Sequence, residues 1–122
     1  ILGLNSYFSN QPKGILSEID SGGRRLPRSI IQKILLARSI ADKPKLLLLE
    51  DAFEHVQLQE RRRMIDFLTS PENPWTIVAV SSDAYLASKS HSIALMENGG
   101  IQSIGDFDKM KNTIGIKETT HA

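Results

Sequence analysis

The stretch 46-LLLLEDAFEH-55 decides how this part of the chain folds, because four consecutive leucines run directly into two adjacent carboxylates. An apolar run of this length, bounded by Pro44, is too short for a core helix and predicts a buried strand over residues 45–50. Glu50 and Asp51 would then stand at the carboxyl end of that strand, where α/β folds bind their ligands. Adjacent residues of an extended chain point to opposite sides, so both acids reach one ligand only if a turn begins at Asp51.

Helical and strand patterns alternate along the rest of the chain. Apolar spacing and Pro/Gly punctuation predict helices over residues 1–10, 26–44, 57–68 and 83–89, strands over 75–82, 91–98 and 100–105, and one or two helical turns over 105–110. Gly99-Gly100 is expected to turn the last two strands into a hairpin. We expect a loop over 15–25 and a frayed tail over 111–122. This alternation predicts an α/β layered fold around a largely parallel sheet with a C-terminal hairpin.

Composition excludes several classes of function. The 122 residues suit one domain, and 15 basic against 14 acidic residues give a net charge of +1, which offers no overall case for binding nucleic acid. No cysteine is present, so neither disulfides nor thiolate chemistry are expected. No apolar run approaches the ~20 residues that span a bilayer. Because the chain begins at Ile1 without a methionine, we expect it to be a piece of a longer polypeptide.

The helix predicted over 26–44 has an apolar face and a basic start. Pro27 suits the first helical turn. The apolar residues at helical spacing, which predict the core face, are Ile30, Ile31, Ile34, Leu35, Ala37 and Ile40. The basic patch of Arg24, Arg25 and Arg28 is either solvated or in contact with a phosphate or a membrane domain. Arg61–Arg63 are interpreted as a solvated helix face, and the three histidines lack the spacing of metal ligands.

The order of these segments resembles the C-terminal half of the ATP-binding domain of ABC transporters, over roughly residues 2–110. The family opens a helix with L-S-G-G-Q and closes it with A-R-A-L, and 37-ARSI-40 resembles that close. Its Walker B strand ends in D-E, which falls on Glu50-Asp51, and its next strand ends in a switch histidine, which falls on Ser82. The segment 95-LMENGGIQSIG-105 resembles the ending L-x-x-G-x-I-x-x-x-G. The resemblance therefore implies a partial P-loop NTPase fold.

The resemblance also implies roles for single residues. Counted back without a gap from 37-ARSI-40, the signature falls on 26-LPRSI-30, and 21-SGG-23 falls on the glycine-bearing stretch before it. The signature positions would face the nucleotide of the opposite subunit, and they are occupied by Pro27, Arg28, Ser29 and Ile30. A D-loop would span Glu54–Gln57, with Gln57 in place of its aspartate. Glu50 would hold Mg²⁺, Asp51 would act on the attacking water, and Ser82 would border the γ-phosphate.

Departures from the family's pattern imply a degenerate ATP site. Pro27 has no N–H to offer a phosphate. Asp51, in place of the catalytic glutamate, shifts its carboxylate by one methylene, and about 1 Å of misplacement can cost a hundredfold in rate. No G-x-x-x-x-G-K-[ST] motif occurs in the chain. We therefore expect this chain alone to bind ATP poorly and to be inactive, whether or not the parent protein is an ATP hydrolase.

The resemblance implies the following organisation and partners. Residues 1–44 would end the helical subdomain, residues 45–110 would form the Walker B and switch part of the core, and residues 111–122 would be a tail. ABC transmembrane domains and a second, head-to-tail ATP-binding domain would be its partners at the cytoplasmic face of the membrane, with ATP and Mg²⁺ as cofactors. The alternative is a non-catalytic interaction or regulatory module that retains the scaffold. An unpaired hydrophobic sheet edge would promote self-association.

Overall fold

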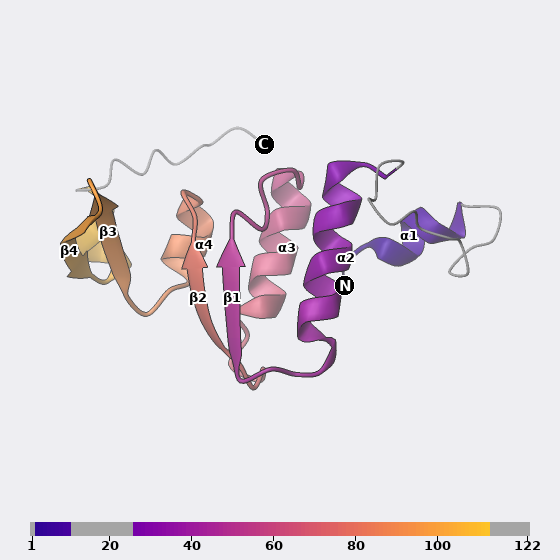
Figure 1. Cartoon of the computed structure of the whole chain (residues 1–122), viewed down its shortest axis with the longest axis horizontal. Helices are drawn as coiled ribbons and strands as arrows, with labels where there is room; N and C mark the ends of the chain where they lie inside the picture. Colours follow the sequence, from indigo (N-terminus) through magenta and orange to yellow (C-terminus); the bar gives the residue numbers. More distant parts are fainter. Residues whose placement is uncertain (1, 11–25, 113–122) are drawn as a thin grey trace. The chain divides into compact units, whose positions relative to one another are not determined.

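The computed structural model describes residues 2–10 and 26–112 of the chain (Figure 1). The elements in chain order are α1 (Leu4–Ser9), α2 (Arg28–Ala41), β1 (Leu46–Glu50), α3 (Leu58–Leu68), β2 (Thr76–Val80), α4 (Ala84–Ser88), β3 (Ile93–Glu97), β4 (Gly100–Gly105) and α5 (Phe107–Met110). Each helix and strand predicted from the sequence is present, so the α/β class, with a parallel sheet and an antiparallel hairpin, is confirmed. The predicted loop over 15–25 and the tail beyond 112 lie outside the described residues.

Two compact units divide the chain, residues 1–80 and residues 81–122, and each is described by itself. The first unit holds α1, α2, β1, α3 and β2. The second holds α4, β3, β4 and α5. The organisation into residues 1–44 and 45–110 that the family resemblance implies stays a prediction.

The sheet of the first unit consists of β1 and β2, which pair in parallel from Leu46 opposite Thr76 to Glu50 opposite Val80. Burial alternates along β1: Leu47 and Leu49 are 3% and 7% exposed, whereas Leu46 and Leu48 are 53% and 69% exposed. The prediction of a fully buried strand is therefore wrong. The leucines serve two different faces of the sheet, and one of those faces is covered.

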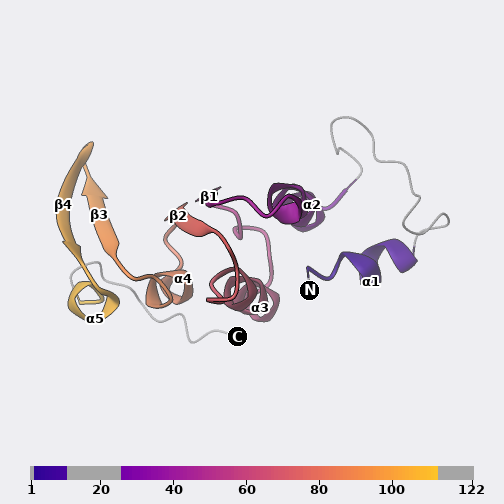
Figure 2. The same cartoon turned by 90° about the horizontal axis from the view of Figure 1, so that it is seen from below.

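The uncovered side of this sheet, which we call the open face, is apolar. It is formed by Leu46 and Leu48 of β1 together with Val78 and Val80 of β2, which are 54% and 66% exposed. Helix α3 lies on the other side of the sheet (Figure 2). Strand β2, predicted over residues 75–82, also has this open side. Parallel strands are normally covered on both faces.

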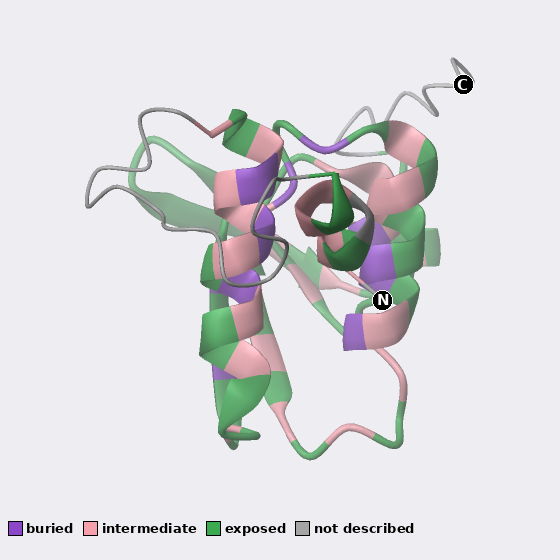
Figure 3. Ribbon diagram, turned by 90° about the vertical axis from the view of Figure 1, so that its right-hand side faces the viewer, coloured by how far each residue is buried: buried purple, intermediate pink, exposed green. Residues whose placement is uncertain are grey.

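The core of the first unit lies between the sheet and helices α2 and α3, whose buried positions are purple in Figure 3. Met64, Ile65 and Leu68 are at most 2% exposed and form the inner face of α3. The prediction for α2 needs correction. Its buried positions are Ile30, Lys33 and Leu36, at a spacing of three, while Leu35 of the predicted apolar face is 48% exposed.

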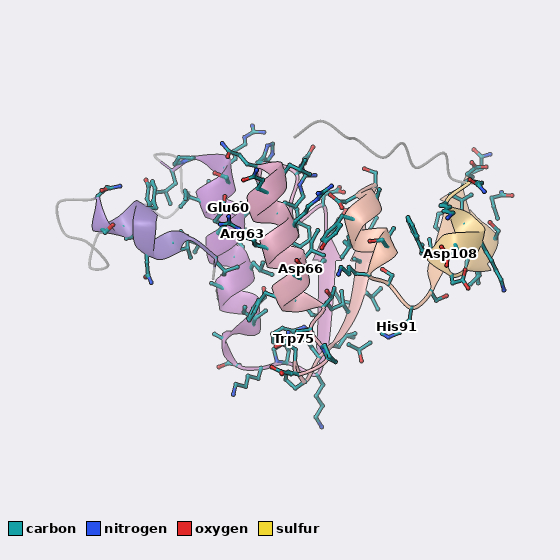
Figure 4. All side chains as sticks on the ribbon, turned by 180° about the vertical axis from the view of Figure 1, so that it is seen from behind. Glu60, Arg63, Asp66, Trp75, His91 and Asp108 are labelled. Carbon is teal, nitrogen blue, oxygen red and sulfur yellow. The ribbon has the colours of Figure 1, made fainter. Side chains whose placement is uncertain are left out.

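Lys33 is buried because Glu60 of α3 neutralises it. The Lys33 Nζ atom lies 2.5 Å from the Glu60 Oε1 atom, and the two side chains are 6% and 34% exposed. The start of α1 reaches the same pair: a Cβ on Gly3 would lie 2.7 Å from Glu60 Oε1 and 3.5 Å from Lys33 Nζ. A larger residue at position 3 would therefore displace the Glu60 carboxylate, and Gly3 has a φ of 72°, which glycine adopts without strain. Figure 4 labels Glu60 on α3.

Side chains in the connection between α3 and β2 donate hydrogen bonds to carbonyls at the end of α3. Trp75 Nε1 donates to the Leu68 carbonyl at 2.9 Å, and its ring meets Phe67 edge-on with centroids 6.4 Å apart. Asn73 Nδ2 donates to the Phe67 carbonyl at 2.5 Å. These bonds satisfy carbonyls that the last helical turn leaves without partners. Trp75, labelled in Figure 4, is thus a packing residue.

The second unit is built on the hairpin of β3 and β4, which pairs Leu95 with Ser103 and Glu97 with Gly100. Its two-residue turn is Asn98-Gly99, with φ values of 50° and 78°, and positive φ at both central positions defines a type I′ turn. The turn predicted at Gly99-Gly100 is therefore displaced by one residue, since Gly100 already pairs in the ladder. Met110 of α5 is buried against the hairpin, in contact range of Gly105.

Candidate functional site

The two acids stand where β1 ends. Glu50 is the last strand residue and pairs with Val80, the last residue of β2. Asp51 has a φ of 46°, in the left-handed region, so the extended conformation stops there and a turn begins, which is the condition for both acids to reach one ligand. Both residues are exposed. Because β1 and β2 are parallel, the acid pair and the exit of β2 leave the same edge of the sheet.

The backbone of Asp51 is held while its carboxylate is accessible. Its N–H donates to the Val80 carbonyl at 3.1 Å, which extends the strand pairing by one bond beyond Glu50. Its carbonyl accepts from the Glu54 N–H at 3.4 Å, closing the first turn after the strand. A residue whose peptide bonds are fixed projects its side chain in a defined direction. Asp51 therefore combines a fixed backbone with an exposed side chain.

The loop between β1 and α3 is anchored by two apolar residues, Phe53 and Val56, each 3% exposed. Gln57 follows as the N-cap of α3, with φ and ψ of −60° and 148°. Its side chain makes no capping hydrogen bond and is exposed, so the amide is available to a ligand. A second glutamine, Gln32 of α2, contacts this loop through its side-chain amide. The sequence reasoning missed Gln32, because a glutamine in a helix gives no pattern of its own.

The start of α2 carries the predicted signature residues. Pro27 is the N-cap, and its carbonyl accepts from the N–H groups of Ile30 and Ile31 at 3.0 and 3.1 Å. The Ile30 side chain is 7% exposed and packs in the core. The Arg28 side chain is exposed and that of Ser29 is half-buried. Of the four predicted residues, Arg28 thus offers the most accessible polar group.

Ser82 belongs to the second unit and is exposed. It follows β2 by two residues in the chain, after Ser81, whose Oγ accepts from the Asp83 N–H at 3.0 Å. Asp83 in turn caps α4 by accepting from the Leu86 N–H at 2.9 Å. The Ser82 hydroxyl is thus exposed beside a bonded turn, and its place beside the acid pair stays a prediction.

Glu50 and Asp51 carry carboxylates, which are ligands that Mg²⁺ prefers, and the metal site expected at this pair stays a prediction. Two neighbouring carboxylates leave most of the octahedral shell to water and substrate oxygens, which is how Mg²⁺ is usually bound. Among the described residues, no group of three or more metal-ligating side chains is gathered at one place. In the same part of the chain, no helix is long and apolar enough to cross a membrane.

Comparison with known proteins gives several relatives whose names describe transport or ATP binding. The chain is 29% identical over 103 residues to antigen peptide transporter 1 of Rattus norvegicus, covering 81% of the chain and 14% of that protein. It is 25% identical over 112 residues to ATP-binding cassette sub-family C member 2 of the same species, covering 92% of the chain and 7% of that protein. It is 33% identical over 88 residues to a sulfate/thiosulfate import ATP-binding protein of Nephroselmis olivacea, covering 70% of the chain and 24% of that protein.

The chain thus spans between 7% and 24% of the length of these relatives. No protein-family model matches it. One relative is named for sulfate import and another for antigen peptide transport, so their cargoes differ. What they have in common is that they are ABC transporter proteins, and it is to this group that the sequence relates the chain.

Proposed function

We propose that this chain, which is related to ABC transporter proteins, forms the C-terminal part of an ATP-binding domain that couples ATP binding and hydrolysis to transport across a membrane. ABC transmembrane domains and a second ATP-binding domain, placed head-to-tail, would be its partners at the cytoplasmic face of the membrane. The similarity to several transporter proteins over 70% to 92% of the chain supports this assignment.

The arrangement of β1 and β2 carries the proposal. The two strands pair in parallel with Glu50 opposite Val80, and Asp51 adds one more bond to Val80. The acid pair and the chain leaving β2 therefore start from one edge of the sheet, which is where α/β folds bind ligands. A Walker B acid pair and the residue that borders the γ-phosphate are expected at this edge.

Each site residue has a role in this proposal. Glu50 and Asp51 would hold Mg²⁺, which would supply positive charge to neutralise the phosphates. Asp51 orients the attacking water, and Gln57 and Ser82 donate hydrogen bonds near the γ-phosphate. Arg28 and Ser29 face the nucleotide held by the opposite domain.

Turnover at this site is proposed to be slow. Arg28 presents a charge where the family presents a glycine amide, and the Pro27 carbonyl accepts two of the first N–H groups of α2. Asp51 reaches about one methylene less far than a glutamate, and misplacement by about 1 Å can reduce a rate a hundredfold.

A second candidate is a non-catalytic module that keeps this scaffold for binding or regulation. The start of α2 favours it, because Pro27 removes one phosphate-binding N–H outright. The core and sheet pairing described above do not depend on Pro27, so they would persist without turnover.

ATP hydrolysis by the protein that contains this chain together with a P-loop separates the two candidates. We expect Asp51→Asn to reduce the turnover number at least ~tenfold, because the carboxylate that orients water is lost. Glu72→Gln is the matched control, since Glu72 is exposed in the turn before β2, at the opposite end of the parallel strands. Equal turnover by Asp51→Asn and the unmodified protein would remove Asp51 from catalysis and leave the non-catalytic module.

A further inference from the structure

The side-chain amide of Gln32 bonds the loop after β1 at two points. Its Nε2 donates to the Asp51 carbonyl at 3.2 Å, and its Oε1 accepts from the His55 N–H at 3.1 Å. Gln32 lies on α2, 19 and 23 residues before these partners in the chain. Both the donor and the acceptor of the amide are therefore used on one segment, Asp51 at its beginning and His55 near its end.

The first of these bonds acts on a residue in an uncommon conformation. Asp51 has a φ of 46°, in the left-handed region that few non-glycine residues adopt. Its N–H is held by the Val80 carbonyl at 3.1 Å, from the side of β2. The Gln32 amide holds its carbonyl from the side of α2. The two bonds fix the peptide groups on both sides of the Asp51 Cα atom, and so fix the direction in which its carboxylate leaves the backbone.

The loop would stay folded without Gln32. Phe53 and Val56 are each 3% exposed and anchor the segment in the core. The Val56 N–H also donates to the Phe53 carbonyl at 3.1 Å within the loop. What Gln32 adds is control over the polar, exposed part of the segment, where Asp51 lies.

We propose that Gln32 is a positioning residue for the acid pair: its amide holds the loop that carries Asp51, so that the Cα–Cβ bond of Asp51 leaves the end of β1 in a fixed direction. Gln32 touches no substrate in this scheme and acts through the Asp51 backbone. The inference rests on the proposed function for what Asp51 does, but not for how Asp51 is held. It also places control of the acid pair on α2, the helix whose start carries the predicted signature.

Two variants of the 122-residue chain separate the two bonds. Gln32→Ala removes both. Gln32→Glu keeps an acceptor for the His55 N–H but has no donor for the Asp51 carbonyl. Gln59→Ala, at an exposed position of α3, is the matched glutamine control.

Nuclear magnetic resonance can monitor each of the two Gln32 hydrogen bonds, which together we call the clamp, at its partner residue. In Gln32→Ala we expect amide hydrogen exchange of His55 to accelerate about five- to tenfold, as expected for the loss of one hydrogen bond, and the carbonyl ¹³C shift of Asp51 to move. In Gln32→Glu the His55 protection should be kept while the Asp51 carbonyl shift still moves. Exchange of the Leu68 amide, in the buried part of α3, should not change in either variant.

The difference between the local signals of Asp51 and His55 and the exchange of the Leu68 amide distinguishes positioning from general stabilisation. Unchanged signals of Asp51 and His55 in Gln32→Ala would overturn the proposal. So would a uniform acceleration that includes Leu68, because it would report lower global stability rather than a local clamp.

A titration with Mn²⁺ alone then tests the proposed function separately. Paramagnetic broadening should centre on residues 50–52 and need a higher Mn²⁺ concentration, by about threefold or more, in Gln32→Ala than in Gln59→Ala; Gln32→Glu is left out of this comparison because its added carboxylate attracts the cation. Equal Mn²⁺ affinity in these two variants would overturn the role of Gln32 in presenting the carboxylate. Absence of broadening in both variants, together with the local exchange difference, would leave the clamp intact and contradict the metal role of the acid pair.

Discussion

At the scale of single residues, the ammonium group of Lys33 depends on one carboxylate from a neighbouring helix. Glu60 lies 2.5 Å away, and Gly3 leaves room for the pair. Breaking a buried ion pair by removing one partner leaves an uncompensated charge, whereas replacing both partners by apolar groups is often close to neutral. Removing one partner of this pair should therefore destabilise the chain more than replacing both partners.

We expect Glu60→Ala to lower the free energy of unfolding by about 2–3 kcal/mol, because Lys33 loses its partner in the core. Lys33→Met combined with Glu60→Met should recover most of that loss. Urea denaturation followed by circular dichroism measures both, with Glu72→Ala as the surface control. A Glu60→Ala variant as stable as the unmodified chain would contradict the dependence of Lys33 on Glu60.

The hairpin turn gives a second prediction at this scale. Gly99 has a φ of 78° with no atom near its missing Cβ, whereas Gly100 has no positive φ and only a 3.9 Å contact to the Glu97 carbonyl. Gly99→Ala should therefore destabilise the hairpin by about 1–2 kcal/mol through backbone strain alone. Gly100→Ala should be neutral within about 0.5 kcal/mol. Exchange rates of the β3 and β4 amides measure the difference, and similar effects of the two substitutions would contradict the type I′ turn.

At the scale of elements, the sequence predicted which segments are helices and strands, but not which of their faces are covered. A run such as Leu46–Leu49 has the same letters whether a strand is buried on one face or on two. The covered stripe of α2 includes Lys33, which an apolar pattern omits, because its burial depends on a carboxylate on another helix. In the hairpin, Asn98 takes the turn position that a search for paired glycines assigned to Gly100. These differences arise from tertiary partners and backbone dihedral angles, neither of which a hydrophobic pattern encodes.

The alternation along β1 predicts opposite outcomes for neighbouring leucines. Leu47→Ala should cost about 2–5 kcal/mol, because a 3% exposed side chain leaves a cavity. Leu48→Ala should cost less than about 1 kcal/mol in the isolated chain, where this side chain is 69% exposed. Thermal or urea unfolding of both variants provides the comparison. Equal costs would show that the open face is covered in solution.

At the scale of the whole molecule, short motifs in a fixed order placed Glu50 at the end of a strand and Pro27 at the start of a helix, and the structure has both there, while their assignment to an acid pair and a signature stays a prediction. The hydrogen bonds that fix the Asp51 backbone could not be predicted from the sequence. They come from β2, from α2 and from the turn after β1, which lie far apart in the chain. Ser82 belongs to the other compact unit, so its role is predicted from motif order alone. The open face is likewise a property of the assembled sheet and belongs to no single segment.

The open face predicts self-association of the isolated chain. Parallel sheets are normally covered on both faces, and uncovered strand edges invite pairing with other chains. We expect sedimentation velocity to show concentration-dependent dimers or larger species, and the combined substitution Leu48→Thr and Val80→Thr to shift the chain toward monomer. Leu35→Thr is the matched control, since Leu35 is exposed on α2 rather than on the sheet. A clean monomer at high concentration would contradict this prediction.

The bond from Trp75 to the end of α3 also supplies the chain with an optical reporter. Trp75 is the only tryptophan of the 122 residues, and it lies in the first compact unit with its indole N–H bonded to the Leu68 carbonyl. Its fluorescence emission should move to longer wavelength when α3 separates from the start of β2, and melting of the β3–β4 hairpin alone should leave it unchanged. Intrinsic fluorescence and far-ultraviolet spectra recorded on one sample would therefore resolve the loss of the two units without any label.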